Sequence, residues 1–288
     1  MTPNTLTLRR SGRRTAVAML CAIAIGPGPA LAGMWVSTRA GVQAPVPAGR
    51  QLSSAQTVAP TLSADRLDSL VAPIALYPDP LLAQTLAAAT YPSEVEELDQ
   101  WLADHPRLQG EALASAVASQ PWDPSVQSMA ASFDVVHFMD DNIDWTTALG
   151  NAFVAQESDV LDAVQRMRQR ADRAGNLRST EQQIVKKTVV DNQPVIVIEP
   201  GNPQMVYVPY YRPVMVFGPP AYPFPVFVSQ PPASGIALSF GTGGGWGWQP
   251  EWGRRSRIMI NRSNVFVHNS AFYRNRSTWT HNPSRRPA

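Results

Sequence analysis

Residues 70–92 read LVAPIALYPDPLLAQTLAAATYP, and this stretch decides how the chain folds. It carries a single charge, Asp79, and is apolar enough to suggest a membrane span. A span interrupted at its middle by Pro78-Asp79-Pro80 would leave backbone groups unpaired in lipid. We therefore predict the end of one helix, a turn and a second helix, buried together in a core. Asp79 suits the cap of the second helix, and Pro80 suits its first position.

Similar signals for helix starts and ends continue over residues 62–178, where apolar side chains recur at helical spacing. Ser93 and Glu96 have the spacing of a capping box, in which each side chain binds a backbone N–H at the helix start. Trp122-Asp123-Pro124 repeats the Pro-Asp-Pro signal and predicts another helix start. These patterns predict a domain of about six helices over residues 62–178.

After Thr180 the period becomes strand-like in residues 184–190, 195–198 and 204–208, with turn sequences between them. We expect a small antiparallel β meander over residues 179–218, packed on the helices because three strands are marginal alone. Residues 219–288 are rich in proline, glycine, aromatic residues and arginine, which predicts a flexible, low-order C-terminal tail with exposed tryptophans at residues 246–252. The fold class is therefore α+β.

The N-terminus has the pattern of an export signal. Arginines at positions 9–14 precede an apolar run at residues 15–25, and a small-residue cleavage site follows at residues 30–32. The apolar run is too short to span a bilayer, which takes roughly 20 residues. We predict a signal peptide at residues 1–32, a disordered linker at residues 33–61 and a location in the periplasm or cell envelope. No transmembrane span is expected after cleavage, and a retained anchor is the alternative.

Four stretches, LVAPIALYPDPLLAQ, QPWDPSVQSMAASF, DDNIDWTTALGNAF and VIEPGNPQMVYVPYYRP, resemble the bacterial family called domain of unknown function 3300. The likeness covers residues 64–218, and the final WTHNPSRR also resembles the Trp-x-His ending of many members. The resemblance implies an exported envelope protein. It implies no activity and no catalytic residue.

Metal and cofactor chemistry has little support. Asp140, Asn142 and Asp144 have the alternating spacing of a calcium loop, but Trp145 and Asn151 occupy the positions that need glycine and glutamate. The four histidines are scattered, and the only cysteine, Cys21, lies inside the predicted signal. We predict no cofactor and no metal site.

The acidic residues Glu94, Glu96, Glu97 and Asp99 leave two interpretations open. Paired carboxylates can supply the acid and base of a glycoside hydrolase. At a helix start they are more often partners of the helix dipole. The alternative function is thus a cell-wall glycan or peptide hydrolase that uses carboxylates, and whether the protein is an enzyme stays uncertain, leaning against.

The charge distribution favours binding instead. Residues 62–177 hold 18 acidic residues against six arginines, whereas residues 251–288 hold eight arginines and one glutamate. The basic tail could attract the acidic helices or hold an anionic partner. We predict a non-enzymatic binding or scaffold module that engages an anionic envelope polymer or an envelope protein; nucleic acid is not expected outside the cytoplasm. The candidate binding residues are Arg254, Arg255, Arg257, Arg262, Arg274, Arg276, Trp279, Arg285 and Arg286.

Overall fold

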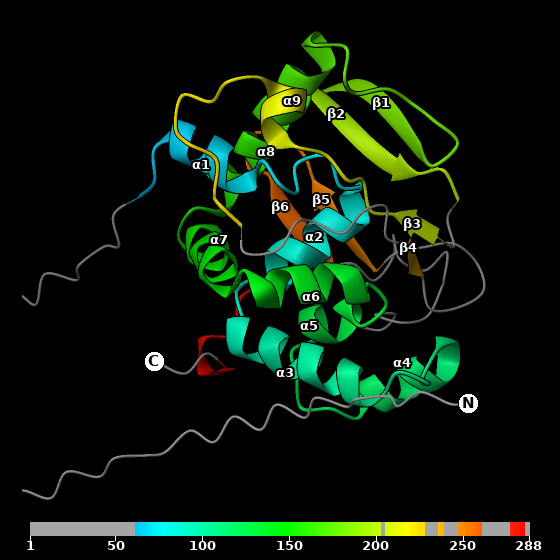
Figure 1. The fold of residues 1–288 in the computed structure, drawn as a ribbon. Coiled ribbons are helices and arrows are strands. Elements are labelled where there is room, and N and C mark those ends of the chain that lie inside the picture. The colour runs from blue at the N-terminus through cyan, green and yellow to red at the C-terminus, as the bar shows by residue number, and fades with distance from the viewer. Residues whose placement is uncertain (1–60, 203–204, 228–235, 239–246, 261–276, 286–288) are drawn as a thin grey trace, which may run out of the picture. The chain divides into compact units, whose positions relative to one another are not determined.

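The computed structural model describes residues 61–202, 205–227, 236–238, 247–260 and 277–285, all in one compact unit (Figure 1). The helices are α1 (Ala64–Val71), α2 (Asp79–Ala88), α3 (Pro92–Asp104), α4 (Gly110–Ala118), α5 (Pro124–Met129), α6 (Phe133–Asp141), α7 (Ile143–Ala155), α8 (Glu157–Arg173) and α9 (Pro213–Phe217). The strands are β1 (Gln183–Val190), β2 (Gln193–Pro200), β3 (Met205–Tyr207), β4 (Ile236–Leu238), β5 (Trp248–Glu251), β6 (Arg257–Ile260) and β7 (Ser277–Thr278). The α+β prediction is confirmed: helices come first, and small antiparallel sheets follow.

The centre of the fold is the stretch quoted above. Every residue from Ser69 to Tyr91 is buried, including all ten residues of α2. A helix that is apolar on all sides needs neighbours all round. Here α5, α7, β2 and β5 surround α2, so the predicted burial of this helix and of the turn before it is confirmed.

Two predicted caps are wrong. Asp79 does not cap α2, because its carboxylate binds groups from other elements. Ser93 and Glu96 do not form a capping box either, since α3 begins at Pro92, two residues earlier than a cap at Ser93 would place it, without a side-chain cap. Proline supplies the first helical position there and needs no hydrogen bond for its nitrogen. By contrast, Asp123 caps α5 as its motif predicts, accepting from the backbone N–H of Ser125 at 3.0 Å.

The helical part contains eight helices between Ala64 and Arg173, somewhat more than expected. The difference comes from abrupt junctions within continuous helical sequence. Asn142 separates α6 from α7, and its side-chain amide donates to the carbonyl of Phe138. Gln156 separates α7 from α8 in the same manner and binds the backbone of Leu62 through both its amide atoms.

In the part of the chain that the structure describes, three small antiparallel sheets follow. β1 and β2 form a hairpin whose turn residues, Asp191 and Asn192, have φ values of 52° and 65°. Such left-handed residues suit a tight hairpin turn, as the sequence predicts. The meander stops there, because β3 pairs with β4 instead of with β2. The third sheet has the order β5-β6-β7.

A buried ion pair ties these sheets to the helices. Arg168 on α8 is fully buried, and its Nη1 lies 2.6 Å from Oδ1 of Asp79. The other carboxylate oxygen of Asp79 accepts from the indole Nε1 of Trp252 at 2.8 Å. The remaining guanidinium hydrogen bonds go to the carbonyls of Ala75, Tyr77 and Ile196. Asp79 and Arg168 therefore join α2, α8, β2 and the residue after β5.

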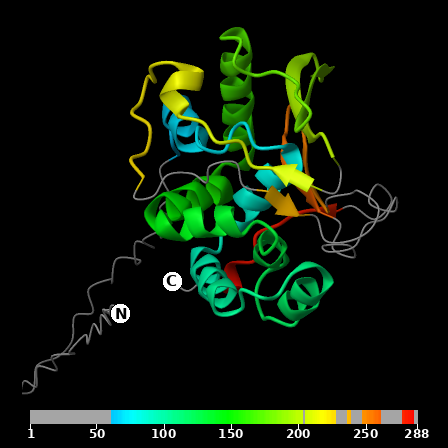
Figure 2. The ribbon, with the colours of Figure 1, turned by 45° about the vertical axis from the view of Figure 1, so that its right-hand side comes forward.

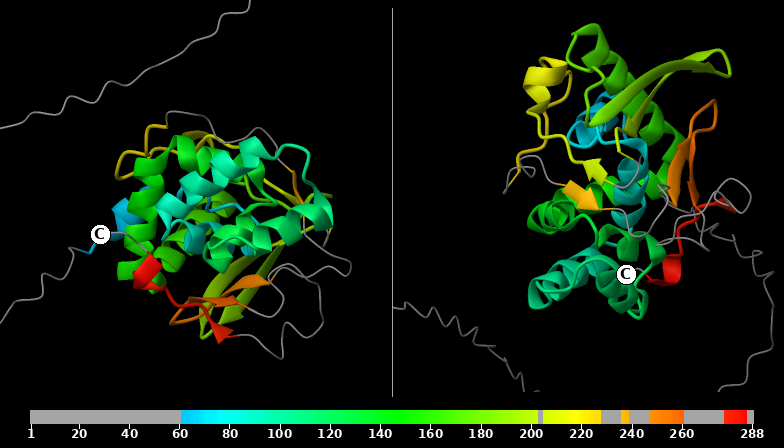
Figure 3. Two further views of the ribbon diagram at one scale, coloured as in Figure 1. Left: turned by 90° about the horizontal axis from the view of Figure 1, so that it is seen from below. Right: turned by 90° about the vertical axis from the view of Figure 1, so that its right-hand side faces the viewer.

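The described parts of the C-terminal region belong to the same core, and Figure 3 shows β5, β6 and the C-terminal segment along one side of the helices. Trp248, Trp252 and Trp279 are all buried, so the expectation of exposed tryptophans in residues 246–252 is wrong for Trp248 and Trp252. The physical reason is long-range: β5 packs against α2, and Glu157 of α8 accepts from the backbone N–H of Ile258 at 2.8 Å.

Candidate binding site

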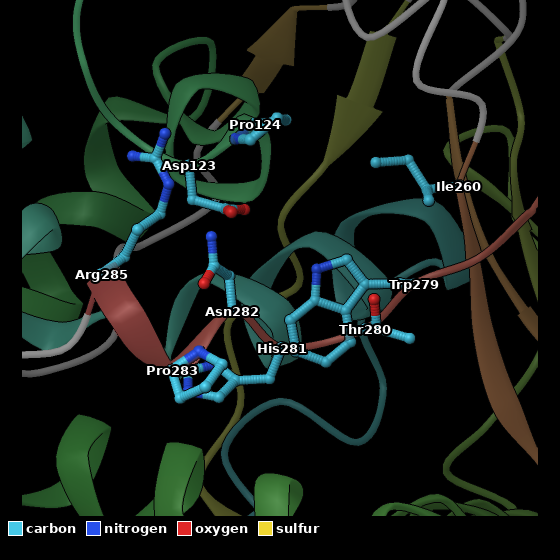
Figure 4. Close-up of a pocket in the computed structure, with 9 residues that line it drawn as sticks. All are labelled: Asp123, Pro124, Ile260, Trp279, Thr280, His281, Asn282, Pro283 and Arg285. Atoms are coloured by element: carbon cyan, nitrogen blue, oxygen red, sulfur yellow. The ribbon is translucent and has the colours of Figure 1, made fainter.

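A cavity of about 500 Å³ lies between the start of α5, the end of β6 and the C-terminal segment (Figure 4). This volume is typical of small-ligand sites. The cavity is lined by Asp123, Pro124, Ile260, Trp279, Thr280, His281, Asn282, Pro283 and Arg285. It thus combines residues that are more than 130 positions apart in the chain.

The motif Trp122-Asp123-Pro124 builds one wall. Trp122 is buried and donates its indole N–H to Oε2 of Glu97 on α3 at 2.9 Å. This contact anchors the residue before Asp123. The carboxylate of Asp123 accepts from both the backbone N–H and the hydroxyl of Ser125 through the same oxygen, Oδ1. Figure 4 shows the carboxylate directed into the cavity, and the Tyr91 hydroxyl is a further hydrogen-bond partner of this carboxylate.

The C-terminal segment builds the opposite wall. The ring of Trp279 stacks on Phe153 of α7 at a centroid distance of 5.6 Å, and its backbone N–H donates to Ile258. The ring of His281 stacks on Tyr91 at 5.0 Å. The hydroxyl of Tyr91 then accepts from the backbone N–H of Asn282 at 2.8 Å. The residues at the end of the central hydrophobic stretch thereby fix the position of the C-terminal segment.

One ion pair closes the site. The guanidinium of Arg285 lies 3.4 Å from Oε1 of Glu94 and also binds the carbonyl of Pro121. The other oxygen of Glu94 accepts from the backbone N–H of Asp123 at 2.5 Å. Burial raises the pKa of Glu94, although both hydrogen bonds oppose the shift. Burial also raises the pKa of Tyr91 to about 12.

The cavity offers both hydrogen-bond donors and acceptors to a ligand. Figure 4 shows the side-chain nitrogen of Asn282 directed towards Asp123, and the indole nitrogen of Trp279 on the side of the ring that faces both. Arg285 adds a positive charge, and the exposed Thr280 adds a hydroxyl. A ligand that matches this set presents several hydroxyl or amide groups and an acidic group. In the ranges that the structure covers, no group of three or more His, Cys, Asp or Glu side chains could hold a metal ion.

The predicted binding residues fall into two places. Trp279 and Arg285 line the cavity, and Trp279 is buried against Phe153. Arg254 and Arg255 are exposed in the turn between β5 and β6, and Arg257 pairs with Glu251 at 2.7 Å. These three therefore lie at the opposite end of β6 from the cavity residue Ile260. Arg262, Arg274, Arg276 and Arg286 lie outside the described residues.

Sequence reasoning missed Asp123, Thr280, His281 and Asn282 as site residues. The sequence predicts Asp123 only as part of a helix start, whereas its carboxylate both caps α5 and faces the cavity. The only local signal for the other residues is that WTHNPSRR resembles a family ending. The structure shows that this ending and the Trp-Asp-Pro motif meet in one cavity.

Comparison with known proteins shows the family of the chain. The model of a family described as "Protein of unknown function (DUF3300)" matches residues 63–281, a range that includes both walls of the cavity up to His281. The chain belongs to this family. A search of curated proteins finds the uncharacterised protein YacH of Escherichia coli (strain K12), which is 37% identical over 280 residues. That match covers 80% of this chain and 45% of YacH, so the chain spans about half the length of this relative. No solved structure gives a significant match.

Within the described ranges, no helix is both long and apolar enough to cross a membrane.

Proposed function

We propose that the protein is an exported, non-enzymatic binding module of the cell envelope, and that its C-terminal cavity holds saccharide units of an anionic wall polymer. The basic region and apolar run at residues 9–25 support export. The relation to YacH adds only family membership, because that relative is itself described as uncharacterised.

The juxtaposition of Asp123, Asn282, Trp279 and Arg285 around one cavity carries the proposal. A saccharide hydroxyl can donate to Asp123 and accept from Asn282 or the indole N–H at the same time. The guanidinium of Arg285 suits an acidic substituent of the polymer, because arginine pairs well with carboxylate and phosphate. Its side chain is 35% exposed, so a ligand can reach it although it already contacts Glu94.

The test is co-sedimentation of the purified protein with isolated cell-wall sacculi across a salt series. Arg285→Gln should weaken the binding by at least about tenfold, because hydrogen bonds to charged groups contribute about 1.5–3 kcal/mol. Thr280→Val should weaken the binding less, since this substitution removes only a neutral hydroxyl and leaves the shape of the side chain nearly unchanged. The salt dependence should be smaller for Arg285→Gln than for the unmodified protein.

Arg107→Gln is the matched control, because Arg107 is an exposed arginine that does not line the cavity. It should bind sacculi as the unmodified protein does. Equal binding by Arg285→Gln and Arg107→Gln would contradict the proposal. A deletion of residues 219–288 is not a usable test, because it removes Trp248, Trp252 and Trp279 from the core.

The second candidate is a wall hydrolase, and one observation favours it. Glu94 has a raised pKa and lies beside Asp123, as a carboxyl pair in an acid–base site would. Against it, both oxygens of Glu94 are engaged by Arg285 and by the backbone of Asp123, and Glu94 does not line the cavity. Release of soluble sugar or peptide from sacculi, abolished by Glu94→Gln, would establish the hydrolase and overturn the proposal.

A further inference from the structure

A second cavity, independent of the C-terminal site, is an apolar groove of about 560 Å³ on the helical part. It lies between the end of α3, the loop at residues 105–109, α4 and the turn from α5 to α6. Its apolar lining comes mainly from Leu102, Pro106, Leu108, Leu113, Ala130 and Phe133. Figure 2 shows α3 and α4 at one end of the helical part, remote from β1 and β2.

The groove exists because α4 is only lightly attached. Leu113 and Val117 are the only buried residues of α4, and the rest of its surface is open. Phe133 at the start of α6 is 45% exposed on the facing side. A concave apolar surface of this kind marks an interaction site more often than single scattered exposed side chains do.

Acidic residues are the neighbours of the groove-lining residues at three places in the chain. The exposed residues Asp104, Glu111 and Asp134 each follow a lining residue in the chain. Arg107 is the one arginine or lysine next to a lining residue in the chain. The ring of His137 stacks on Phe133 at 5.9 Å, and its Nδ1 lies 3.2 Å from Oδ2 of Asp99 on α3. This contact connects the groove to a further group of carboxylates.

That group is dense enough for its members to repel one another. Burial raises the pKa of Asp140, and the negative charges of Asp99, Glu96 and Asp141 raise it further. We call these acidic residues of α3, α4 and α6 the acidic margin of the groove; the three helices contain no lysine or arginine.

We propose that the groove binds a basic amphipathic segment of a partner protein, with apolar side chains in the groove and lysine or arginine side chains on the acidic margin. The charge decides between occupants. Anionic lipid headgroups would be repelled by the margin. A second copy of the chain related by a two-fold axis would bring the same acidic residues together, which disfavours self-association here.

The test uses two labelled synthetic helical peptides that share one leucine face and carry either lysine or glutamate at every polar position. Binding to the purified protein is measured by fluorescence anisotropy. The lysine peptide should bind at least about tenfold more tightly than the glutamate peptide, and added salt should reduce the difference. Phe133→Ser should weaken the binding of the lysine peptide by about tenfold or more.

Val154→Ser is the matched control, because Val154 on α7 is also 45% exposed but does not line the groove. It should leave peptide binding unchanged. Equal affinities for the two peptides, or equal effects of Phe133→Ser and Val154→Ser, would overturn the proposal. So would Phe133-dependent binding to phosphatidylglycerol vesicles in place of the peptide, or Phe133-dependent dimerisation in sedimentation.

Discussion

Asp79 shows most clearly how a single residue acts beyond its local context. Its carboxylate accepts hydrogen bonds from Arg168, from the indole of Trp252 and from the backbone N–H of Ile198. The guanidinium of Arg168 also lies over the ring of Trp252, with its Cζ 5.2 Å from the ring centroid. A buried charge is tolerated only when it is paired and hydrogen-bonded, and here both partners are.

We expect Arg168→Met to lower the free energy of unfolding by about 3–5 kcal/mol, because it leaves the Asp79 carboxylate buried without its partner. Urea denaturation followed by circular dichroism measures this. Arg166→Met is the control on the same helix, since the Arg166–Asp68 pair is partly exposed and should contribute no more than about 1 kcal/mol. Equal losses in the two variants would contradict a structural role for the buried pair.

A second residue, Tyr211, holds the turn between α1 and α2. Its hydroxyl donates to the carbonyl of Ala72 at 2.7 Å and accepts from the backbone N–H of Leu76 at 3.2 Å. Burial raises the pKa of this phenol well above its ordinary value. Tyr211→Phe should lower the free energy of unfolding by about 1–3 kcal/mol, because two buried backbone groups lose a partner. A change below about 0.5 kcal/mol in urea denaturation would show that the turn does not depend on them.

At the scale of elements, close packing of α7 on the end of α2 depends on Gly150. A Cβ added at Gly150 would lie 1.9 Å from the carbonyl oxygen of Ala89. Gly150→Ala should therefore force the helices apart and lower the melting temperature by several degrees, since overpacking costs about 1–3 kcal/mol or more.

Gly110→Ala is the comparison for that prediction. Gly110 has a φ of 54° but open space around its Cβ position, so only backbone strain of about 1 kcal/mol is expected. If Gly110→Ala were the more damaging change in calorimetry, helix contact at Gly150 would not be the limiting feature.

Elements with a local signal are the ones that the sequence predicts well. The prolines and apolar spacing around residues 70–92 locate α1, α2 and the turn between them, and the Asp191-Asn192 pair locates the β1–β2 turn. The strand that pairs with β3 is not predictable in this way. This partner strand, β4, is more than 25 residues away in a region rich in proline and glycine.

The same reasoning explains the errors on the C-terminal region. Trp248 lies among glycines, so its local sequence indicates a flexible segment, yet its burial depends on contact with α2. Asp79 resembles a cap locally, whereas its true partners are 89 and 173 residues away. Likewise, no short-range pattern places Asn282 beside Asp123 in the candidate site.

At the scale of the whole molecule, the acidic helices and the C-terminal region do associate, but only partly through charge. Arg285 pairs with Glu94, whereas Asp79 and Glu157 accept from the Trp252 indole and the Ile258 backbone. The C-terminal segment is therefore held by hydrogen bonds and buried tryptophans. This leaves Arg254 and Arg255 exposed and available to a partner.

Stability should depend on pH in a definite direction. Burial raises the pKa of the Glu94, Asp140, Glu157 and Asp162 carboxyl groups above their ordinary values of 3.8 for Asp and 4.5 for Glu. Between the pKa of such a group in the unfolded chain and its raised pKa in the folded state, the folded protein binds more protons than the unfolded chain. The free energy of unfolding therefore falls as the pH rises from the lower to the higher of these two pKa values.

Protonation of His137 acts in the same direction. Its hydrogen bond to Asp99 raises the pKa of His137 above 6.5, so its stabilisation is present below 6.5 and is lost as the pH rises through the raised pKa. We expect the melting temperature to decline as the pH rises from about 4.5 through the raised pKa of His137, and Glu157→Gln to reduce the decline at the acidic end of this range. A melting temperature that rises over this range would contradict the assignment.

The central claim is that the C-terminal segment completes a saccharide-binding cavity, and the indole signals in a ¹H–¹⁵N spectrum test it most directly. Trp279 lines the cavity, whereas the indole N–H of Trp252 is buried on Asp79 and serves as an internal reference. The Trp279 indole signal is assigned as the one that disappears in Trp279→Phe. When a soluble glycan fragment of the cell wall is added in increasing amounts, this signal should shift until the site is saturated. The Trp252 signal should stay in place. A Trp279 signal that does not move while the fragment binds would contradict the account.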